Sequence, residues 1–180
     1  RDAKTNLAPP ELLALHPLGK SPLIELDGRL VSESAAIVEL VCQKYGKDMI
    51  PDMESEAYVN HMELMHFAEG SVMTPILLNL YTSKLGDAAA PLQPRIHSEL
   101  TNHFAYMERT LRPSGHWVLD RLSAADIMLS FPATVVLRYD RAAEFPKIAA
   151  FVKWMQNRPA FQAAVTKGGP VALGDQVEVL

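Results

Sequence analysis

The stretch HPLGKSPLIELDGRLVSESAAIVELVCQKYG, residues 16–46, decides the fold of this chain. It contains two short runs rich in strand-forming residues, 21–26 and 29–31, with Asp27-Gly28 between them. An Asp-Gly pair that joins two such runs favours a two-residue hairpin, because a type I′ turn needs positive φ at both central positions. The stretch therefore predicts two short antiparallel strands.

Helical segments are predicted on both sides of this hairpin. Residues 8–15 form a loop and one helical turn, which ends at His16 because a residue before proline is pushed out of the α region. Residues 32–45 form a longer helix, and Gly46 is a typical helix stop. The polar, proline-containing segment 47–54 follows as a linker.

The remainder of the chain predicts helices and no further strand. A kink or break is expected between Gly70 and Pro75, because a proline inside a helix removes a backbone hydrogen bond. The predicted helices are residues 54–85, residues 91–111, a helix that begins at Ser123, one from Pro146 to about residue 157, and a short one from Pro159.

The start of the helix at Ser123 has a specific chemical signature. Ser123 can accept a hydrogen bond from the first turn, while Asp126 reaches back to the N–H of the cap residue. This is a capping box with Asp in place of the more usual Glu. Leu122 and Ile127 have the spacing of a hydrophobic staple on either side of it.

Composition excludes several classes of function. The 180 residues are 48% hydrophobic and 21% charged, with a net charge of −4, which suits a globular protein and argues against binding to a phosphate backbone. No apolar run approaches the roughly 20 residues that a membrane-spanning helix needs. Cys42 is the single cysteine, so an intramolecular disulfide is impossible, and a reducing cytoplasmic location is expected.

The histidines and the cysteine do not predict a reactive or metal centre. His61 and His66 are five residues apart, which places them well off one helix face, and His97 and His103 are six apart. We therefore expect no metal ion. Cys42 lies on a mostly apolar helix, where a buried structural thiol is the more common case than a nucleophile.

Three features near the hairpin are candidates for ligand binding. Ser21-Pro22 is either a proline at a strand edge or a cis peptide that turns backbone polar groups outward. Glu33-Ser34 is either ordinary helix capping or an anion site at a helix N-terminus. Lys20 is either a solvated side chain or a partner for a carboxylate. Their joint spacing around one hairpin suits a small zwitterionic peptide.

These features resemble the glutathione-binding domain of cytosolic glutathione transferases, and the polar start of the chain is similar to bacterial, theta-like members. The segment from Trp117 through the capping box, and FPKIAAFVKWMQNRPAF at 145–161, resemble the all-α domain of that family. The resemblance implies an α/β plus all-α fold. It implies a partial, truncated thioredoxin-like glutathione-binding domain at residues 1–47, an all-α domain at 54–167 and a C-terminal tail at 168–180.

The resemblance also implies a role for each candidate residue. The main chain of Ser21 would pair with the cysteinyl backbone of glutathione, with Pro22 as the cis residue. Glu33 would take the γ-glutamyl ammonium, and Ser34 with the helix N–H groups would take the γ-glutamyl carboxylate. Lys20 would reach the glycyl carboxylate. The segment 66–71 falls where the family's substrate cleft is lined, although a solvated helix kink explains it as well.

By the same resemblance the protein is a glutathione transferase that conjugates the glutathione thiolate to a small hydrophobic electrophile, as a homodimer. In the family, the Ser, Tyr or Cys that activates the thiol lies in a first strand or helix, which this sequence is expected to lack. The catalytic residue is therefore unknown. Two alternatives stay open: a non-catalytic interaction module, or a glutathione-dependent disulfide reductase if a cysteine lies upstream.

Overall fold

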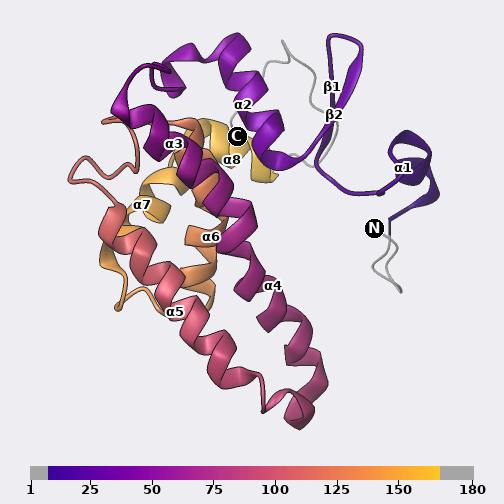
Figure 1. Ribbon diagram of the computed structural model, residues 1–180, viewed down its shortest axis with the longest axis vertical. Coiled ribbons are helices and arrows are strands. Elements are labelled where there is room, and N and C mark those ends of the chain that lie inside the picture. Colours follow the sequence, from indigo (N-terminus) through magenta and orange to yellow (C-terminus); the bar gives the residue numbers. More distant parts are fainter. Residues whose placement is uncertain (1–7, 167–180) are drawn as a thin grey trace.

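The computed structural model describes residues 8–166, and Figure 1 shows a β-hairpin with a short helix on one side of a larger helical body. The predicted α/β plus all-α class is confirmed. The first elements are α1 (Pro10–Leu15), β1 (Leu23–Leu26), β2 (Arg29–Ser32), α2 (Ser34–Tyr45) and a 3₁₀ turn (Lys47–Met49). The helical body contains α3 (Glu56–His66), a π-helical turn (Phe67–Ser71), α4 (Met73–Thr82), a 3₁₀ segment (Ser83–Ala89), α5 (Gln93–Thr110), α6 (Ala124–Arg138), α7 (Pro146–Gln156) and α8 (Pro159–Thr166).

The hairpin forms as the sequence predicts. Its two strands pair antiparallel, with Leu26 opposite Arg29, so that only Asp27 and Gly28 make the turn. Both turn residues have positive φ, 53° and 75°, which is the requirement of a type I′ turn. The predicted tail at 168–180 lies outside the described residues, and the proposed division at 47–54 stays a prediction.

The chain before β1 is fixed by a close backbone approach at Gly19. Gly19 has φ of +55°, and a Cβ at this position would lie 2.6 Å from Leu13 Cδ2. Only glycine fits here without displacing its neighbours. His16 ends α1 in an extended conformation, as predicted, and its Nε2 lies 3.5 Å from Ser32 Oγ at the end of β2. These contacts place the segment before β1 beside Ser32, at the end of the hairpin opposite its turn, which we call the open end.

The predicted break in the long helix is a π-helical turn, and it lies earlier than expected. The N–H of Val72 donates to the carbonyl of Phe67 at 3.0 Å, which is the wider i→i+5 pattern. Pro75 is then the third residue of α4, and the hydroxyl of Thr74 donates to the carbonyl of Gly70 at 3.1 Å. The wide turn therefore accommodates the proline without ending the helical path.

Helix α6 lies in the middle of the helical body, and α2, α3, α4 and α7 all contact it (Figure 1). It is the most buried helix because apolar side chains cover most of its circumference. Its fully or nearly buried apolar residues are Ala124, Ala125, Met128, Leu129, Ala133, Val135 and Val136. The fully buried Phe104 of α5 and Ile148 of α7 belong to the same apolar cluster.

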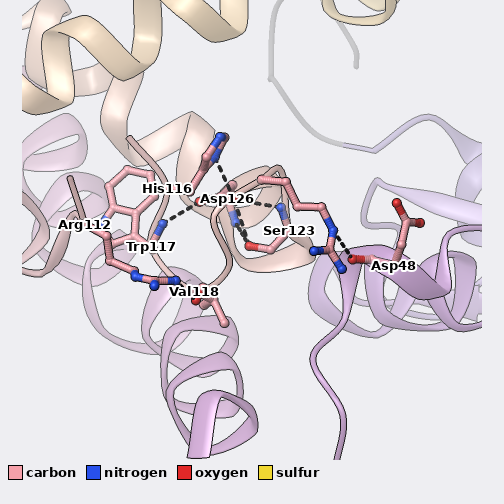
Figure 2. A network of polar contacts seen from close by, with 8 residues as sticks. Asp48, Arg112, His116, Trp117, Val118, Ser123 and Asp126 are labelled. Carbon is pink, nitrogen blue, oxygen red and sulfur yellow. Dashed lines mark hydrogen bonds and ion pairs between the residues drawn. The ribbon is translucent and has the colours of Figure 1, made fainter. Parts of the chain in front are cut away.

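The predicted capping box starts α6. Asp126 Oδ2 accepts hydrogen bonds from the backbone N–H of Ser123 at 2.7 Å and from its hydroxyl at 2.8 Å, and Asp126 N–H lies 3.3 Å from the same hydroxyl oxygen. Asp126 Oδ1 accepts a further bond from the N–H of Trp117 at 2.9 Å (Figure 2). Asp126 is fully buried, so this one carboxylate satisfies buried donors from both the cap and the preceding segment.

We predict that Asp126→Ala lowers the free energy of unfolding by about 3 kcal/mol, because it leaves the buried N–H groups of Trp117 and Ser123 without acceptors. Urea unfolding followed by far-UV circular dichroism measures this loss. Asp87→Ala is the matched control, since Asp87 is exposed and its side chain has no partner among the described residues. A loss below about 1 kcal/mol for Asp126→Ala would contradict this role of the carboxylate.

Candidate functional site

The predicted binding residues meet at the open end of the hairpin. Leu23 pairs with Ser32, so Pro22 and Glu33, one residue beyond each, leave the sheet at the same end. Ser34 begins α2 directly after Glu33. The strand register therefore brings together two pairs of residues, Ser21-Pro22 and Glu33-Ser34, which lie more than ten positions apart in the sequence.

The Ser21-Pro22 peptide is cis, which confirms the second of the two interpretations of this pair. The peptide lies directly before β1, and both residues are exposed. Lys20 precedes it and is also exposed, and its side chain has no hydrogen bond or ion pair in the part of the chain that the structure describes. The structure therefore places Lys20 on the same loop but fixes no contact between it and the other four residues.

The start of α2 differs from an ordinary capped helix. No side chain caps it, so the interpretation of Glu33-Ser34 as ordinary helix capping is wrong. The first helical bond runs from the N–H of Ile37 to the carbonyl of Glu33 at 2.9 Å. Within the described residues, the N–H groups of the three preceding positions, 34–36, have no acceptor. A helix N-terminus with free N–H groups is suited to an anion.

Glu33 adopts a strained backbone conformation. Its φ of 73° and ψ of 118° lie in a region that residues with a Cβ rarely occupy. Such conformations cost about 1–3 kcal/mol and persist where the surrounding structure imposes them. Here the strain turns the chain from β2 directly into α2 and leaves the Glu33 carboxylate exposed beside Ser34.

Ser34 also borders a small cavity between α2, the π-helical turn and α6, which we call the Ser34 cleft. Its volume is about 260 Å³. The hydroxyl of Ser34 and the carboxylate of Glu69 are its polar lining groups, and the rest is apolar. The lining residues are Ser34, Val38, Ala68, Glu69, Met73, Ile127, Met128, Phe131 and Pro132.

The sequence anticipated only part of this cleft. The segment 66–71 does contribute to it, through Ala68 and Glu69, and Met73 lines it as well. Met65, which directly precedes this segment, is buried in the core instead. The wall from α6 was missed, because residues that line a cleft and residues that face the core show the same apolar spacing along a helix.

Two polar contacts hold α2 in place against the helical body. The carboxylate of Glu39 on α2 lies 2.9 Å from Nε2 of the fully buried His61 on α3. In the 3₁₀ turn that follows α2, the carbonyl of Asp48 accepts a hydrogen bond from Arg121 Nε at 3.0 Å (Figure 2). The N-terminus of α2 is thereby kept beside the α6 wall of the Ser34 cleft.

Other candidate groups are structural. Cys42 is buried, burial raises the pKa of its thiol, and the sulfur lies 3.9 Å from Met49 Sδ, so the predicted structural thiol is confirmed.

In residues 8–166, no group of three or more His, Cys, Asp or Glu side chains is placed to hold a metal ion. None of the described helices is long and apolar enough to cross a membrane.

Comparisons with known proteins agree with this geometry. Residues 3–49 match the family model described as glutathione S-transferase, N-terminal domain, and residues 72–167 match glutathione S-transferase, C-terminal domain. Glutathione S-transferase 1 of Saccharomyces cerevisiae is 28% identical over 193 residues, covering 93% of this chain and 81% of that protein. A glutathione S-transferase of Pseudomonas putida is 28% identical over 160 residues, covering 83% of this chain and 72% of that protein.

Solved structures show the same fold. The crystal structure of a glutathione S-transferase from Actinobacillus pleuropneumoniae superposes with a TM-score of 0.77 at 28% identity, covering 88% of this chain and 74% of the other. A sphingomonad glutathione S-transferase, solved in complex with glutathione, superposes with a TM-score of 0.72 at 22% identity, covering 85% of this chain and 76% of the other. The second likeness concerns the fold alone.

We predict that Glu33→Gly is more stable than Glu33→Ala by about 1 kcal/mol, because glycine adopts the conformation at position 33 without steric cost. The comparison isolates the backbone, since both variants lack the carboxylate. The gain is smaller than the full strain because glycine also loses more chain entropy on folding. Urea unfolding measures the difference. An alanine variant at least as stable as the glycine variant would show that the position is not strained.

Proposed function

This chain belongs to the glutathione S-transferase family, and on that premise we propose that it joins the thiolate sulfur of glutathione to a small apolar electrophile. The observation that carries the proposal is the open end of the hairpin, where an uncapped helix N-terminus, an exposed carboxylate and a cis peptide lie beside an apolar cleft. A thioether forms between the sulfur and the electrophilic carbon. In a substitution the leaving group departs with its bonding electrons, and in an addition to a double bond the electron pair moves to the acceptor atom, which then takes a proton.

Each group at the hairpin end has a role in holding the tripeptide. The γ-glutamyl carboxylate binds the free N–H groups of α2 and the Ser34 hydroxyl, because a helix N-terminus favours an anion. The Glu33 carboxylate takes the γ-glutamyl ammonium. The main chain of Ser21, before Pro22, pairs with the cysteinyl backbone, and Lys20 takes the glycyl carboxylate. The tripeptide is thus held by its two charged ends and by its backbone.

The Ser34 cleft is the proposed electrophile site. It adjoins Ser34, so a tripeptide bound at the start of α2 places its sulfur near the apolar wall of Ile127, Met128 and Phe131. An apolar wall collects an apolar electrophile and excludes water from the thiolate. The group that lowers the pKa of the glutathione thiol is not assigned to any position of this sequence. The buried Cys42, whose own thiol pKa is raised, is not that group.

The alternative of a non-catalytic interaction module has less support. Strain at Glu33 costs stability, and a scaffold gains nothing from it. A bound anion offsets this cost, because it binds the free N–H groups of α2 in the geometry that the strained residue creates. The disulfide-reductase alternative needs a cysteine upstream of the given sequence, and the buried Cys42 does not supply one.

We further propose that the protein is a homodimer. Exposed large apolar side chains concentrate on α3, α4 and the segment that follows them. These side chains are Val59, Met62, Leu77, Leu78, Leu80, Tyr81 and Leu85. Apolar surface of this extent on adjacent elements is unusual for a monomer and favours burial against a second copy.

We predict that Ser34→Ala and Glu33→Gln each weaken glutathione binding by about 1–3 kcal/mol, since each removes a charge-assisted hydrogen bond to the γ-glutamyl group. Isothermal titration calorimetry with glutathione measures the change. Ser98→Ala is the matched control, because Ser98 is exposed on α5 and far from the hairpin in sequence. Wild-type affinity in the Ser34 or Glu33 variant would show that glutathione binds elsewhere.

We predict that the protein runs at twice its chain mass of 19.9 kDa in size-exclusion chromatography with light scattering, and that Tyr81→Glu shifts it toward the monomer. Tyr81 is 62% exposed, so the change does not disturb the core, whereas a buried carboxylate in an interface is costly. Leu15→Glu, at the exposed end of α1, serves as the control. A monomeric wild-type protein, or equal effects of the two variants, would refute an interface on α4.

A further inference from the structure

The Ser34 cleft has one charged lining group, and the binding of glutathione does not use it. Of the nine residues that line the cleft, seven are apolar, and the two polar ones are Ser34 and Glu69. The proposed function assigns Ser34 to the γ-glutamyl carboxylate and gives Glu69 no part. The Glu69 carboxylate therefore distinguishes this cleft from a purely apolar one.

The carboxylate of Glu69 is free to pair with a ligand. It forms no hydrogen bond or ion pair with any other residue in the range 8–166. His66, one turn earlier, is exposed and does not line the cleft. The exposed Arg138 lies over the ring of Phe131, 6.0 Å from its centroid, and it is not a lining residue either. Because no cation lines the cleft, the negative charge of Glu69 acts directly on whatever binds there.

The π-helical turn at Phe67–Ser71 presents Glu69 to the cleft from an anchored backbone. The bond from the N–H of Val72 to the carbonyl of Phe67 closes this turn around Glu69. Ala68, the residue before Glu69, is only 1% exposed and lines the same cleft. The position of the carboxylate is therefore set by a wide turn whose neighbouring residue is packed in the core.

The charges around the cleft favour a cationic occupant. Glutathione bound as proposed brings its thiolate to the same cleft as the Glu69 carboxylate, so two negative groups share one small volume. A positive group bound beside Glu69 relieves their repulsion. Met73 and Met128 add polarisable thioethers to the wall. Phe131, whose ring already has a guanidinium over it, adds an aromatic surface that attracts positive charge.

We infer that Glu69 makes the Ser34 cleft selective for electrophiles that carry a positively charged nitrogen on an apolar ring. The inference rests on the proposed function and names its substrate class. The ring lies against the apolar wall from α6, the reacting carbon meets the sulfur near Ser34, and the cationic nitrogen pairs with Glu69. The cleft volume of about 260 Å³ suits a single substituted ring. An electrophile with a carboxylate in the same place is disfavoured, because like charges repel.

The test is isothermal titration calorimetry of the intact protein with glutathione and with three S-benzyl thioethers of glutathione. Their rings carry a para-aminomethyl, a para-hydroxymethyl or a para-carboxyl group, so they differ mainly in the charge at one end of the ring. Each thioether is a product that the proposed reaction would form. We expect the cationic aminomethyl thioether to bind about fivefold more tightly than the neutral one, and the carboxyl thioether about fivefold more weakly, which is the scale of an exposed ion pair.

Three variants locate the group that recognises the charge. Glu69→Gln should bring the three affinities to within about twofold of one another, and Glu69→Lys should reverse their order. Glu69 is exposed, so neither change disturbs the core. Glu63→Gln is the matched control, because Glu63 is exposed on α3, lies outside the lining and gives the same change in net charge. It should keep the preference of the wild-type protein.

Each contrary result has a distinct meaning. Wild-type protein that binds the three thioethers with equal affinity would overturn the inference and leave the proposed function standing. A preference for the ammonium group that persists in Glu69→Gln, or that Glu63→Gln reduces to the same extent, would show that a different charge is responsible, which also overturns the inference. Absence of binding to glutathione and to all three thioethers would contradict the proposed function and the inference together.

Discussion

The buried carboxylate of Asp126 determines where α6 begins, and the rest of the helical body is arranged around that helix. Its two oxygens satisfy the cap residue Ser123 and the N–H of Trp117, so the segment before α6 and the helix itself are fixed by one group. A buried charge is stable only when its hydrogen bonds are complete, which leaves little freedom in how the surrounding chain is placed. α2, α3, α4 and α7 then pack on a helix whose position is already set.

The surroundings of α6 differ in chemistry from one side of the helix to another. One side of α6 supplies the apolar wall of the Ser34 cleft, against which the hydrogen bond between Glu39 and His61 holds α2. On another side, the segment before α6 carries His116. Its Nδ1 lies 3.3 Å from Asp126 Oδ2, and its ring contacts Trp154 of α7. The proposed glutathione site is strained and uncapped at the start of α2, whereas the start of α6 is capped. The start of α2 is thus proposed to bind a ligand, whereas the start of α6 stabilises the fold.

Local chemistry determined which parts of this structure the sequence could predict. The Asp27-Gly28 turn and the Ser123 capping box depend on residues within four positions of one another, and both formed as expected. The π-helical form of the turn at Phe67–Ser71 was not predicted, because no local residue pattern distinguishes an i→i+5 turn from the kink expected between Gly70 and Pro75.

The central claim is that the strained, uncapped junction between β2 and α2 holds the γ-glutamyl end of glutathione and directs its sulfur to the Ser34 cleft. A crystal structure of the protein with glutathione tests this most directly. The account predicts the γ-glutamyl carboxylate within hydrogen-bond distance of Ser34 Oγ and the first N–H groups of α2, with the sulfur at the mouth of the cleft. Glutathione bound elsewhere, or bound there with its sulfur turned away from the α6 wall, would contradict it.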